Sequence, residues 1–155
     1  MAQDDLASGP SGRKPPPKCK ALLICDHCRE DPRTARVSVI DILESFRVND
    51  FPTRSPPFTV FSQLVDGIGV YAVSLEIHDL LDGEVVAMAD IVELFFSERP
   101  ARMDFIIPDV SVPLPHFGRY DLVLLANGQE IERQFYDAED ADEEETQGNE
   151  VEPQS

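Results

Sequence analysis

The sequence predicts an all-β protein, an antiparallel β-sandwich of about eight strands, from two observations. Between Ala21 and Tyr136, short apolar runs with a period of two are separated by turn residues, and no stretch shows the 3.6-residue period of an amphipathic helix. The dipeptides Asp82-Gly83 and Asn127-Gly128 each stand between two such runs. Because these dipeptides adopt positive φ angles at low cost, both predict a hairpin of antiparallel strands.

The strands can be assigned in order along the chain. The clearest is Val70–His78, whose residues alternate between an apolar face and a more polar one, as in a half-buried strand. The segment Asp66–Gly69, just before it, is interpreted as a hairpin turn. Short antiparallel strands must hide their apolar faces, and two packed sheets are favoured over a barrel. The eight predicted strands are Ala21–Cys25, Val37–Val48, Phe58–Asp66, Val70–His78, Glu84–Phe96, Arg102–Val110, Arg119–Ala126 and Gln129–Tyr136.

The segment Val112–Tyr120 favours a sandwich of the immunoglobulin-like type. Proline and glycine turn the chain here, and Tyr120 then enters a strand on the same face as Leu122. A tyrosine in this place can bury its ring and return its hydroxyl to the backbone of the preceding loop, which is the tyrosine corner of such sandwiches.

Composition divides the chain into three parts. Residues 1–18 are rich in Gly, Ser and Pro and are expected to form a flexible leader, followed by a β-sandwich domain at 19–136. Residues 137–155 hold nine of the 30 acidic residues and no Lys or Arg, so an acidic, disordered tail is expected. The tail serves solubility, or it docks on a basic partner or shields a basic patch of its own domain.

Charge and hydropathy exclude several classes of function. The net charge of −17 disfavours nucleic-acid binding, which needs Lys and Arg to replace condensed counterions. No run of 18 apolar residues occurs, and the N-terminus lacks the apolar core of a secretory signal, so neither membrane insertion nor secretion is expected. The predicted location is the cytoplasm, where structural disulfides rarely persist.

One cluster could bind a metal. Cys25, His27 and Cys28 are potential zinc ligands, but a closed structural site needs four, and a second C-x-x-C pair is absent. Cys19 lies about 20 Å away along an extended strand, which leaves His78 and His116 as distant candidates. The alternative is that Cys25 is a small buried hydrophobe and Cys28 lies in a loop.

Catalytic signatures are absent from the sequence. There is no Gly-x-Ser-x-Gly elbow, no phosphate-binding loop with its Lys, and no helix predicted after Cys28 to activate a redox thiol. Two of Asp41, Asp90 and Asp104 could form a paired-carboxylate site, and acids could converge with His78 or His116 only in the fold. The protein is therefore predicted not to be an enzyme and to need no cofactor.

The chain resembles a bacterial family that is known only as a domain of unknown function. The resemblance spans about residues 21–136 and rests on Ala21-Leu-Leu-Ile-Cys-Asp26, the Val/Ile-rich second strand, Phe51-Pro52, the Asp82-Gly83 hairpin, and Pro113-Leu-Pro-x-x-Gly-Arg-Tyr120 with Asn127-Gly128. It implies a small immunoglobulin-like sandwich and assigns no functional residue. Cys25-Asp26 fits the family pattern, whereas Cys19, His27 and Cys28 are particular to this chain.

Together these observations predict a non-enzymatic intracellular interaction or accessory module. It would bind a partner, expected to be a protein, through an exposed sheet edge or the loops at one end, because antiparallel edges can accept a strand. The alternative hypothesis is a zinc-stabilised or metal-dependent protein built on Cys25, His27 and Cys28.

Overall fold

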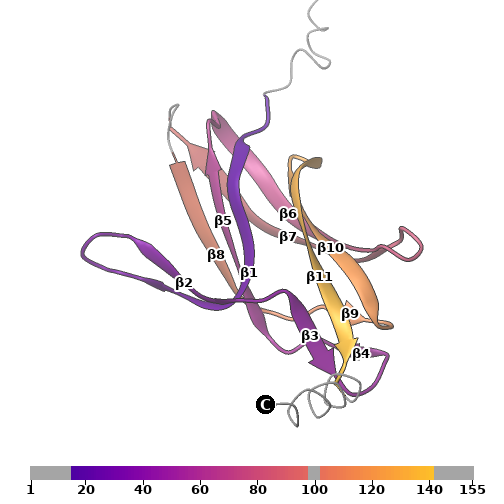
Figure 1. Ribbon diagram of the computed structural model, residues 1–155. Coiled ribbons are helices and arrows are strands. Elements are labelled where there is room, and N and C mark those ends of the chain that lie inside the picture. Colours follow the sequence, from indigo (N-terminus) through magenta and orange to yellow (C-terminus); the bar gives the residue numbers. More distant parts are fainter. Residues whose placement is uncertain (1–14, 98–101, 142–155) are drawn as a thin grey trace, which may run out of the picture.

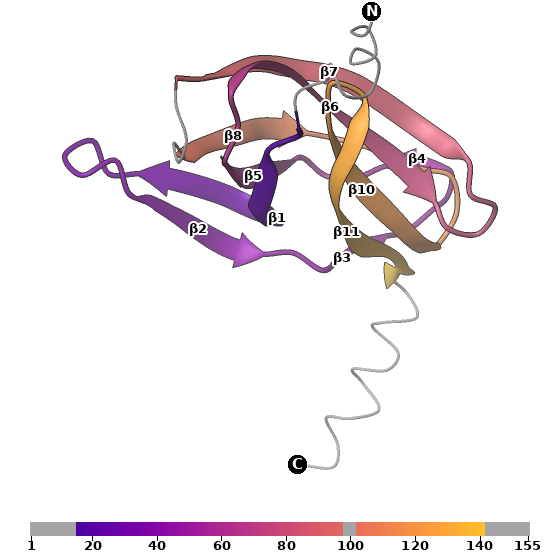
Figure 2. The ribbon, with the colours of Figure 1, turned by 90° about the horizontal axis from the view of Figure 1, so that it is seen from above.

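The computed structural model describes residues 15–97 and 102–141, and the all-β prediction is confirmed. Figures 1 and 2 show two layers of strands facing each other. In chain order the strands are β1 (Lys18–Glu30), β2 (Val37–Ile42), β3 (Ser45–Val48), β4 (Thr53–Arg54), β5 (Phe58–Val65), β6 (Gly69–Asp79), β7 (Val85–Phe96), β8 (Arg102–Val110), β9 (Pro113–Leu114), β10 (Gly118–Ala126) and β11 (Gln129–Asp140).

The strands form a four-stranded sheet, β2-β1-β5-β8, and a five-stranded sheet, β3-β11-β10-β6-β7, with β4 and β9 as a separate short pair. Both hairpin predictions are confirmed, because β6 pairs antiparallel with β7 across Asp82-Gly83, and β10 pairs with β11 across Asn127-Gly128. Gly83 and Gly128 have a φ of 79°, which glycine adopts without steric cost.

The core lies between the two sheets. The predicted apolar face of β6 is buried as expected, and Tyr120 and Tyr136 stack with their ring centroids 5.6 Å apart. Burial of such side chains supplies the main driving force for folding. The core consists of Leu22, Ile24, Phe46, Phe58, Val60, Leu64, Tyr71, Val73, Leu75, Ile77, Leu94, Phe96, Val112, Leu114, Tyr120, Leu122, Leu124, Ala126, Tyr136 and Ala138.

The single strand predicted at Val37–Val48 is wrong, because the chain changes sheets in the middle of this run. β2 pairs with β1 in the four-stranded sheet, whereas β3 pairs with β11 in the five-stranded sheet. The amide of Leu43 donates to the Ile24 carbonyl at 2.7 Å, and the Glu44 carbonyl accepts from Asp137 at 3.1 Å. Two adjacent residues thus bond to different sheets, and β3 pairs parallel with β11 in an otherwise antiparallel arrangement.

The hairpin turn predicted at Asp66–Gly69 is also wrong. β5 and β6 belong to different sheets, so this segment crosses from one layer to the other. Gly67 lies directly against the ring of the buried Phe96, and a Cβ at this position would be 2.6 Å from the nearest ring carbon. The glycine therefore permits a close approach of backbone to ring at the crossover.

Replacing Gly67 with Ala is expected to lower the free energy of unfolding by about 1–3 kcal/mol, as overpacking does. The cause would be the clash with Phe96, which is 1% exposed. Denaturant unfolding measures the loss, and the control combines Gly67→Ala with Phe96→Leu. If the clash is the cause, the double variant loses less than the sum of the single losses; a strictly additive result would contradict it.

The C-terminal strand is longer than predicted. β11 continues past Tyr136 to Asp140, and its last four residues pair with β3. The acidic tail predicted from residue 137 therefore begins no earlier than residue 141. The remainder of that tail, 142–155, and most of the predicted leader, 1–14, lie outside the described residues.

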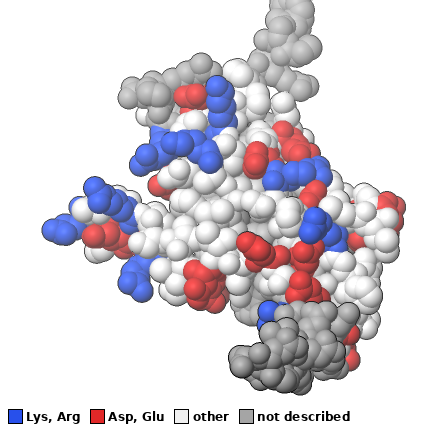
Figure 3. All heavy atoms as spheres, in the orientation of Figure 1, with Lys and Arg blue, Asp and Glu red and all other residues white. Residues whose placement is uncertain are grey.

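The first strand is also longer than predicted and ends in a projecting arm. β1 pairs with β5 as far as Cys25, and from Cys25 to Glu30 it pairs with β2. This second half of β1 and β2 form the two-stranded arm on the left of Figures 1 and 2. Figure 3 shows both basic and acidic side chains at the projecting tip of the arm and a mostly uncharged surface where the arm meets the body. The arm places Cys28 in a strand, not in the predicted loop.

Candidate binding cleft

Two of the predicted metal ligands meet at the base of the arm. Cys25 and Cys28 have their sulfur atoms 3.7 Å apart, and both are free thiols. Cys25 is fully buried, and burial, followed by the neighbouring Cys28 thiol, raises the pKa of the Cys25 thiol to about 12. Because the thiolate is the nucleophilic form of cysteine, this environment disfavours the reactive form of Cys25.

The other predicted ligands do not join this pair. The His27 ring is half-exposed and its Nδ1 lies 2.7 Å from the carboxylate of Asp26. Cys19 lies at the other end of the β1–β5 pairing, where its thiol donates to the Ala21 carbonyl at 3.2 Å. Within residues 15–97 and 102–141, no group of three His, Cys, Asp or Glu side chains is placed to hold a metal ion. The described residues therefore supply the zinc hypothesis with two sulfur atoms and no third ligand.

His116 holds the corner before β10. Its Nδ1 lies 2.7 Å from the Phe117 carbonyl, and its Nε2 lies 2.6 Å from a carboxylate oxygen of the buried Asp79. The Phe117 carbonyl and then Asp79 raise the pKa of His116. Both ring nitrogens face acceptors, an arrangement that favours the protonated imidazole because its two N–H groups can donate to both.

The hydrogen bond expected of Tyr120 is confirmed. Its ring is fully buried, and its hydroxyl donates to the His116 carbonyl at 2.6 Å. The same hydroxyl accepts from the His116 amide at 3.2 Å. His116, Tyr120 and Asp79 therefore tie the loop before β10 to the end of β6.

His78 lies in a different place, on the outer face of the five-stranded sheet. Its Nε2 is 2.9 Å from Glu76, and nearby Arg133 donates to Asp121 at 2.6 Å and to Glu130 at 2.7 Å. Arg133 lowers the pKa of Glu130. Each histidine thus meets a carboxylate, but the two pairs are separate and neither histidine lines the cleft described below.

The paired-carboxylate site does not form as the sequence analysis considered. Asp41 and Asp104 lie on β2 and β8, the two opposite edges of the four-stranded sheet, and Asp90 lies on β7 in the other sheet. Although β7 and β8 border one cleft, Asp90 lies opposite Ser74 and Asp104 opposite Gln63, so each is on the outer face of its own sheet.

The edge strand β7 differs from the other edge strands, β2, β3 and β8, in length and composition. β3 has only four residues, and β2 is bent at Asp41, whose φ is 58°. β8 contains Pro108, which lacks an amide donor, and has a register irregularity opposite β5 near Asp109, also with a φ of 58°. Short length, proline and irregular backbone all protect an edge from further pairing, and of these β7 has only irregular backbone, at two bulges. β7 has twelve residues without Pro, Lys or Arg, and in the part of the chain that is described it pairs with β6 alone.

β7 bulges at two positions. The register with β6 shifts at Val86 and again at Ile91, and both of these side chains pack against the core. Between the bulges, Ala87 lies opposite Ile77 and Ala89 lies opposite Leu75, so the two alanines are on the inner face of the sheet. Bulges often occur beside functional sites, where they redirect side chains.

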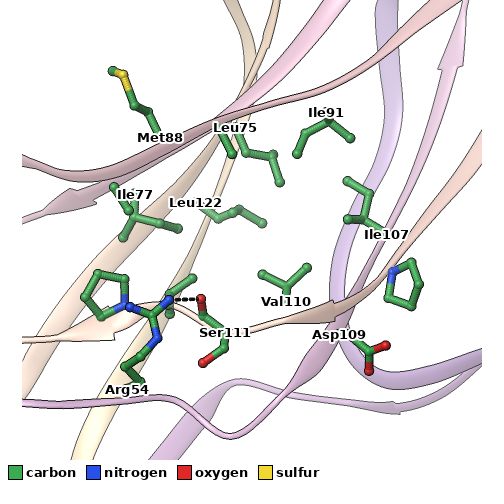
Figure 4. A pocket seen from close by; sticks show the side chains of 15 residues that line it. Arg54, Leu75, Ile77, Met88, Ile91, Ile107, Asp109, Val110, Ser111 and Leu122 are labelled. Carbon is green, nitrogen blue, oxygen red and sulfur yellow. Dashed lines mark hydrogen bonds between the residues drawn. The ribbon is translucent and has the colours of Figure 1, made fainter.

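A cleft opens beneath these alanines. Its cavity has a volume of about 360 Å³ and lies between β7 and β8, because alanine side chains are too short to close the gap between the sheets. The buried side chains of Leu75, Ile77 and Leu122 line it in Figure 4, together with Ile107 and Val110 from β8. At one end, Arg54 donates to the Ser111 carbonyl at 2.6 Å.

The cleft is suited to binding apolar groups. Mostly apolar side chains line it, as is typical of ligand sites, and Arg54 and Asp109 are its charged residues. Neither a nucleophile–base pair nor a cluster of acids lies among its lining residues. Sequence reasoning missed it; the available signal was two alanines at a spacing of two in a run of otherwise large apolar residues.

No helix within the described residues has the length and apolar character needed to span a membrane.

Comparison with known proteins adds the family to this description. No curated protein matches the chain. A family of unknown function, DUF6941, matches residues 20–135, which include most of both large sheets. The chain, with its two-sheet fold and its cleft between β7 and β8, therefore belongs to the DUF6941 family of unknown function.

Proposed function

We propose that this protein is a non-enzymatic interaction module that binds an extended segment of a partner protein along the edge of β7. The observation that carries the proposal is the position of this edge directly above an apolar cavity. A strand added to β7 would complete its backbone hydrogen bonds and could place alternate side chains in the cleft. Affinity from backbone pairing and specificity from side-chain pockets are characteristic of this mode of recognition.

The exposed apolar side chains of β7 support the same surface. Met88 is 68% exposed and Phe95 is 61% exposed, and Val85 and Val92 are each more than 40% exposed. Large apolar side chains exposed on an edge strand are typical of an interaction site or of an aggregation hazard. Because the protein has a net charge of −17, which opposes self-association, binding of a partner accounts for the exposure of these apolar side chains.

A partner protein fits this edge better than a second copy of the chain does. Asp90 and Glu93 lie on β7, and antiparallel pairing of β7 with itself would bring acidic residues of two copies close together. The net charge of −17 adds a long-range repulsion between copies. Like charges on facing strands are unfavourable.

We further propose that the fold is an immunoglobulin-like sandwich in a bacterial protein. The buried Tyr120 and its hydrogen bond to the His116 backbone support this type of sandwich. The cytoplasmic location stays a prediction from the sequence.

Replacing Ala89 with Lys is expected to abolish partner binding through β7. An inward-pointing charge on an edge strand opposes further pairing, and Ala89 points toward the cleft. The matched control is Ser38→Lys, which adds the same charge to β2, an exposed edge of the other sheet. The tagged full chain is expressed at its native level, and co-purifying proteins are quantified for each variant after circular dichroism has shown that both are folded.

Recovery of a partner should fall at least about tenfold with Ala89→Lys, equivalent to about 1.4 kcal/mol, and stay unchanged with Ser38→Lys. The purified partner should then slow amide hydrogen exchange in β7 of the wild-type chain. Equal recovery by all three proteins, or slowed exchange only in other strands, would contradict the proposal. Self-association that disappears with Ala89→Lys would assign the edge to a second copy and would also contradict it.

A further inference from the structure

The two faces of β7 offer a bound strand very different surroundings. On the inner face, Ala87 and Ala89 stand above the apolar cavity. On the outer face, the acids Asp90 and Glu93 are exposed between the apolar side chains of Met88 and Phe95, and Glu76 on β6 lies opposite Met88. Glu76 is paired with His78, whereas β6 and β7 contain no Lys or Arg that could pair with Asp90 and Glu93, which are called the acidic row below.

From this difference we infer that the partner segment alternates large apolar residues with basic ones. The inference rests on the proposed function, because it requires that a strand pairs with β7. Successive side chains of a strand point to opposite faces, so every second residue of the partner would face the cleft and the others would face the acidic row.

The cavity defines the apolar half of this pattern. A volume of about 360 Å³, lined by Leu75, Ile77 and Leu122 among others, can take a leucine or phenylalanine side chain. Burying such a side chain is favourable by about 1.5–3 kcal/mol, whereas alanine would leave the cavity unfilled. A charged side chain would lose its hydration there without gaining a close partner.

The acidic row defines the basic half. Asp90 and Glu93 point away from the cavity, on the same side as the outward residues of β6. Opposite charges on neighbouring strands contribute about 0.2–1 kcal/mol for each pair. Two such pairs therefore favour a basic partner over an acidic one by a measurable factor.

Four synthetic peptides of about nine residues, a length within the normal range of strands, test the inference with the full chain. The reference alternates Lys with Leu. The second replaces Lys with Glu, the third replaces Leu with Ala, and the fourth is the reference with alternate backbone amides N-methylated along one edge. Fluorescence anisotropy gives the Kd of each at one physiological ionic strength, because salt screens charge effects.

A charge-reversed protein tests whether the basic residues of the peptide are attracted by Asp90 and Glu93 or only by the net negative charge of the protein. Asp90→Lys with Glu93→Lys changes the acidic row, and the matched control, Glu30→Lys with Asp50→Lys, changes the net charge equally at two exposed acids outside β6 and β7. Wild type and the control variant should bind the reference peptide about tenfold more tightly than the Glu peptide, as expected for two ion pairs. The variant with Asp90→Lys and Glu93→Lys should instead bind the Glu peptide more tightly than the reference peptide. Wild type should bind the Ala peptide at least about tenfold more weakly than the reference peptide.

The remaining outcomes distinguish the two proposals. If the reference, Glu and Ala peptides bind equally well and only N-methylation abolishes binding, strand pairing stands and the inferred side-chain pattern is overturned. If both charge-reversed proteins respond alike, the preference is only general attraction, and the basic half is overturned. If N-methylation leaves the affinity unchanged, pairing with β7 fails, and the proposed function fails with it. If no peptide binds, the inferred pattern is overturned, and the proposed function is decided by the Ala89→Lys experiment.

Discussion

Replacing Leu122 with Ala is expected to lower the free energy of unfolding by about 3 kcal/mol, within the range of about 2–5 kcal/mol that Leu→Ala changes cost in cores. Leu122 is fully buried in β10, and its side chain lines the cleft. Its truncation removes apolar contacts and enlarges an existing cavity, which the surrounding sheets cannot fill by relaxing. Chemical denaturation measures the loss as a shift of the midpoint at an unchanged slope.

The control for this prediction is Leu125→Ala on the same strand. Leu125 pairs with Ser74 on the outer side of the five-stranded sheet and is 9% exposed. Truncation there opens toward solvent and should cost less than truncation of Leu122. Equal losses for the two variants would show that Leu122 does not support the cleft in the way that its position implies.

Replacing Asp79 with Ala is expected to lower the free energy of unfolding by about 3 kcal/mol. Asp79 is 3% exposed, and its carboxylate accepts from His116 Nε2 at 2.6 Å and from the Leu81 amide at 2.9 Å. Hydrogen bonds to charged groups contribute about 1.5–3 kcal/mol each. Asp79→Asn can keep the bond to Leu81 and is expected to lose less. Thermal or urea unfolding measures both, and equal losses would contradict a role for the His116 bond.

The same corner predicts a dependence of stability on pH. Phe117 and Asp79 raise the pKa of His116 in the folded state. Its contribution is therefore complete below the pKa of an unfolded histidine, about 6.5, and is lost as the pH rises through the folded pKa. The stability advantage of the wild-type chain over His116→Gln should be largest at or below about pH 6 and should shrink toward alkaline pH. An advantage that grows with pH would contradict the assignment.

Local signals predicted much of the fold correctly. The turns at Asp82-Gly83 and Asn127-Gly128 lie where expected, since the φ preferences of these residues act within a few positions. The hydroxyl bond of Tyr120 could be predicted for the same reason, because its acceptor lies only four residues away.

Partners that are distant in sequence explain the errors. The run from Val37 to Val48 looks like one strand, and only the bonds of Leu43 to Ile24 and of Glu44 to Asp137 divide it between two sheets. Asp66–Gly69 has the composition of a hairpin turn, but Gly67 packs on Phe96, nearly thirty residues later in the chain. A local pattern cannot distinguish a turn within a sheet from a crossing between sheets.

The candidate site depends on the tertiary structure to a still greater degree. The sequence directed attention to Cys25, His27 and Cys28, of which the fold brings only the two sulfur atoms together. Ala87 and Ala89 carried no obvious chemical signal, because a small residue in a strand makes a cavity only if the facing residues leave the space empty. Those facing residues, among them Ile107 and Val110, come from a strand of the other sheet.

The sequence by itself determined that this chain forms short strands, where most of them lie, and which of their faces are apolar, because the two-residue period and the turn residues act locally. Only the tertiary structure decided which strands pair, where the chain changes sheets and which edge is left open above the cleft. The physical reason is that backbone hydrogen bonds can join any two strands, so long-range packing selects among pairings that local preferences leave equal.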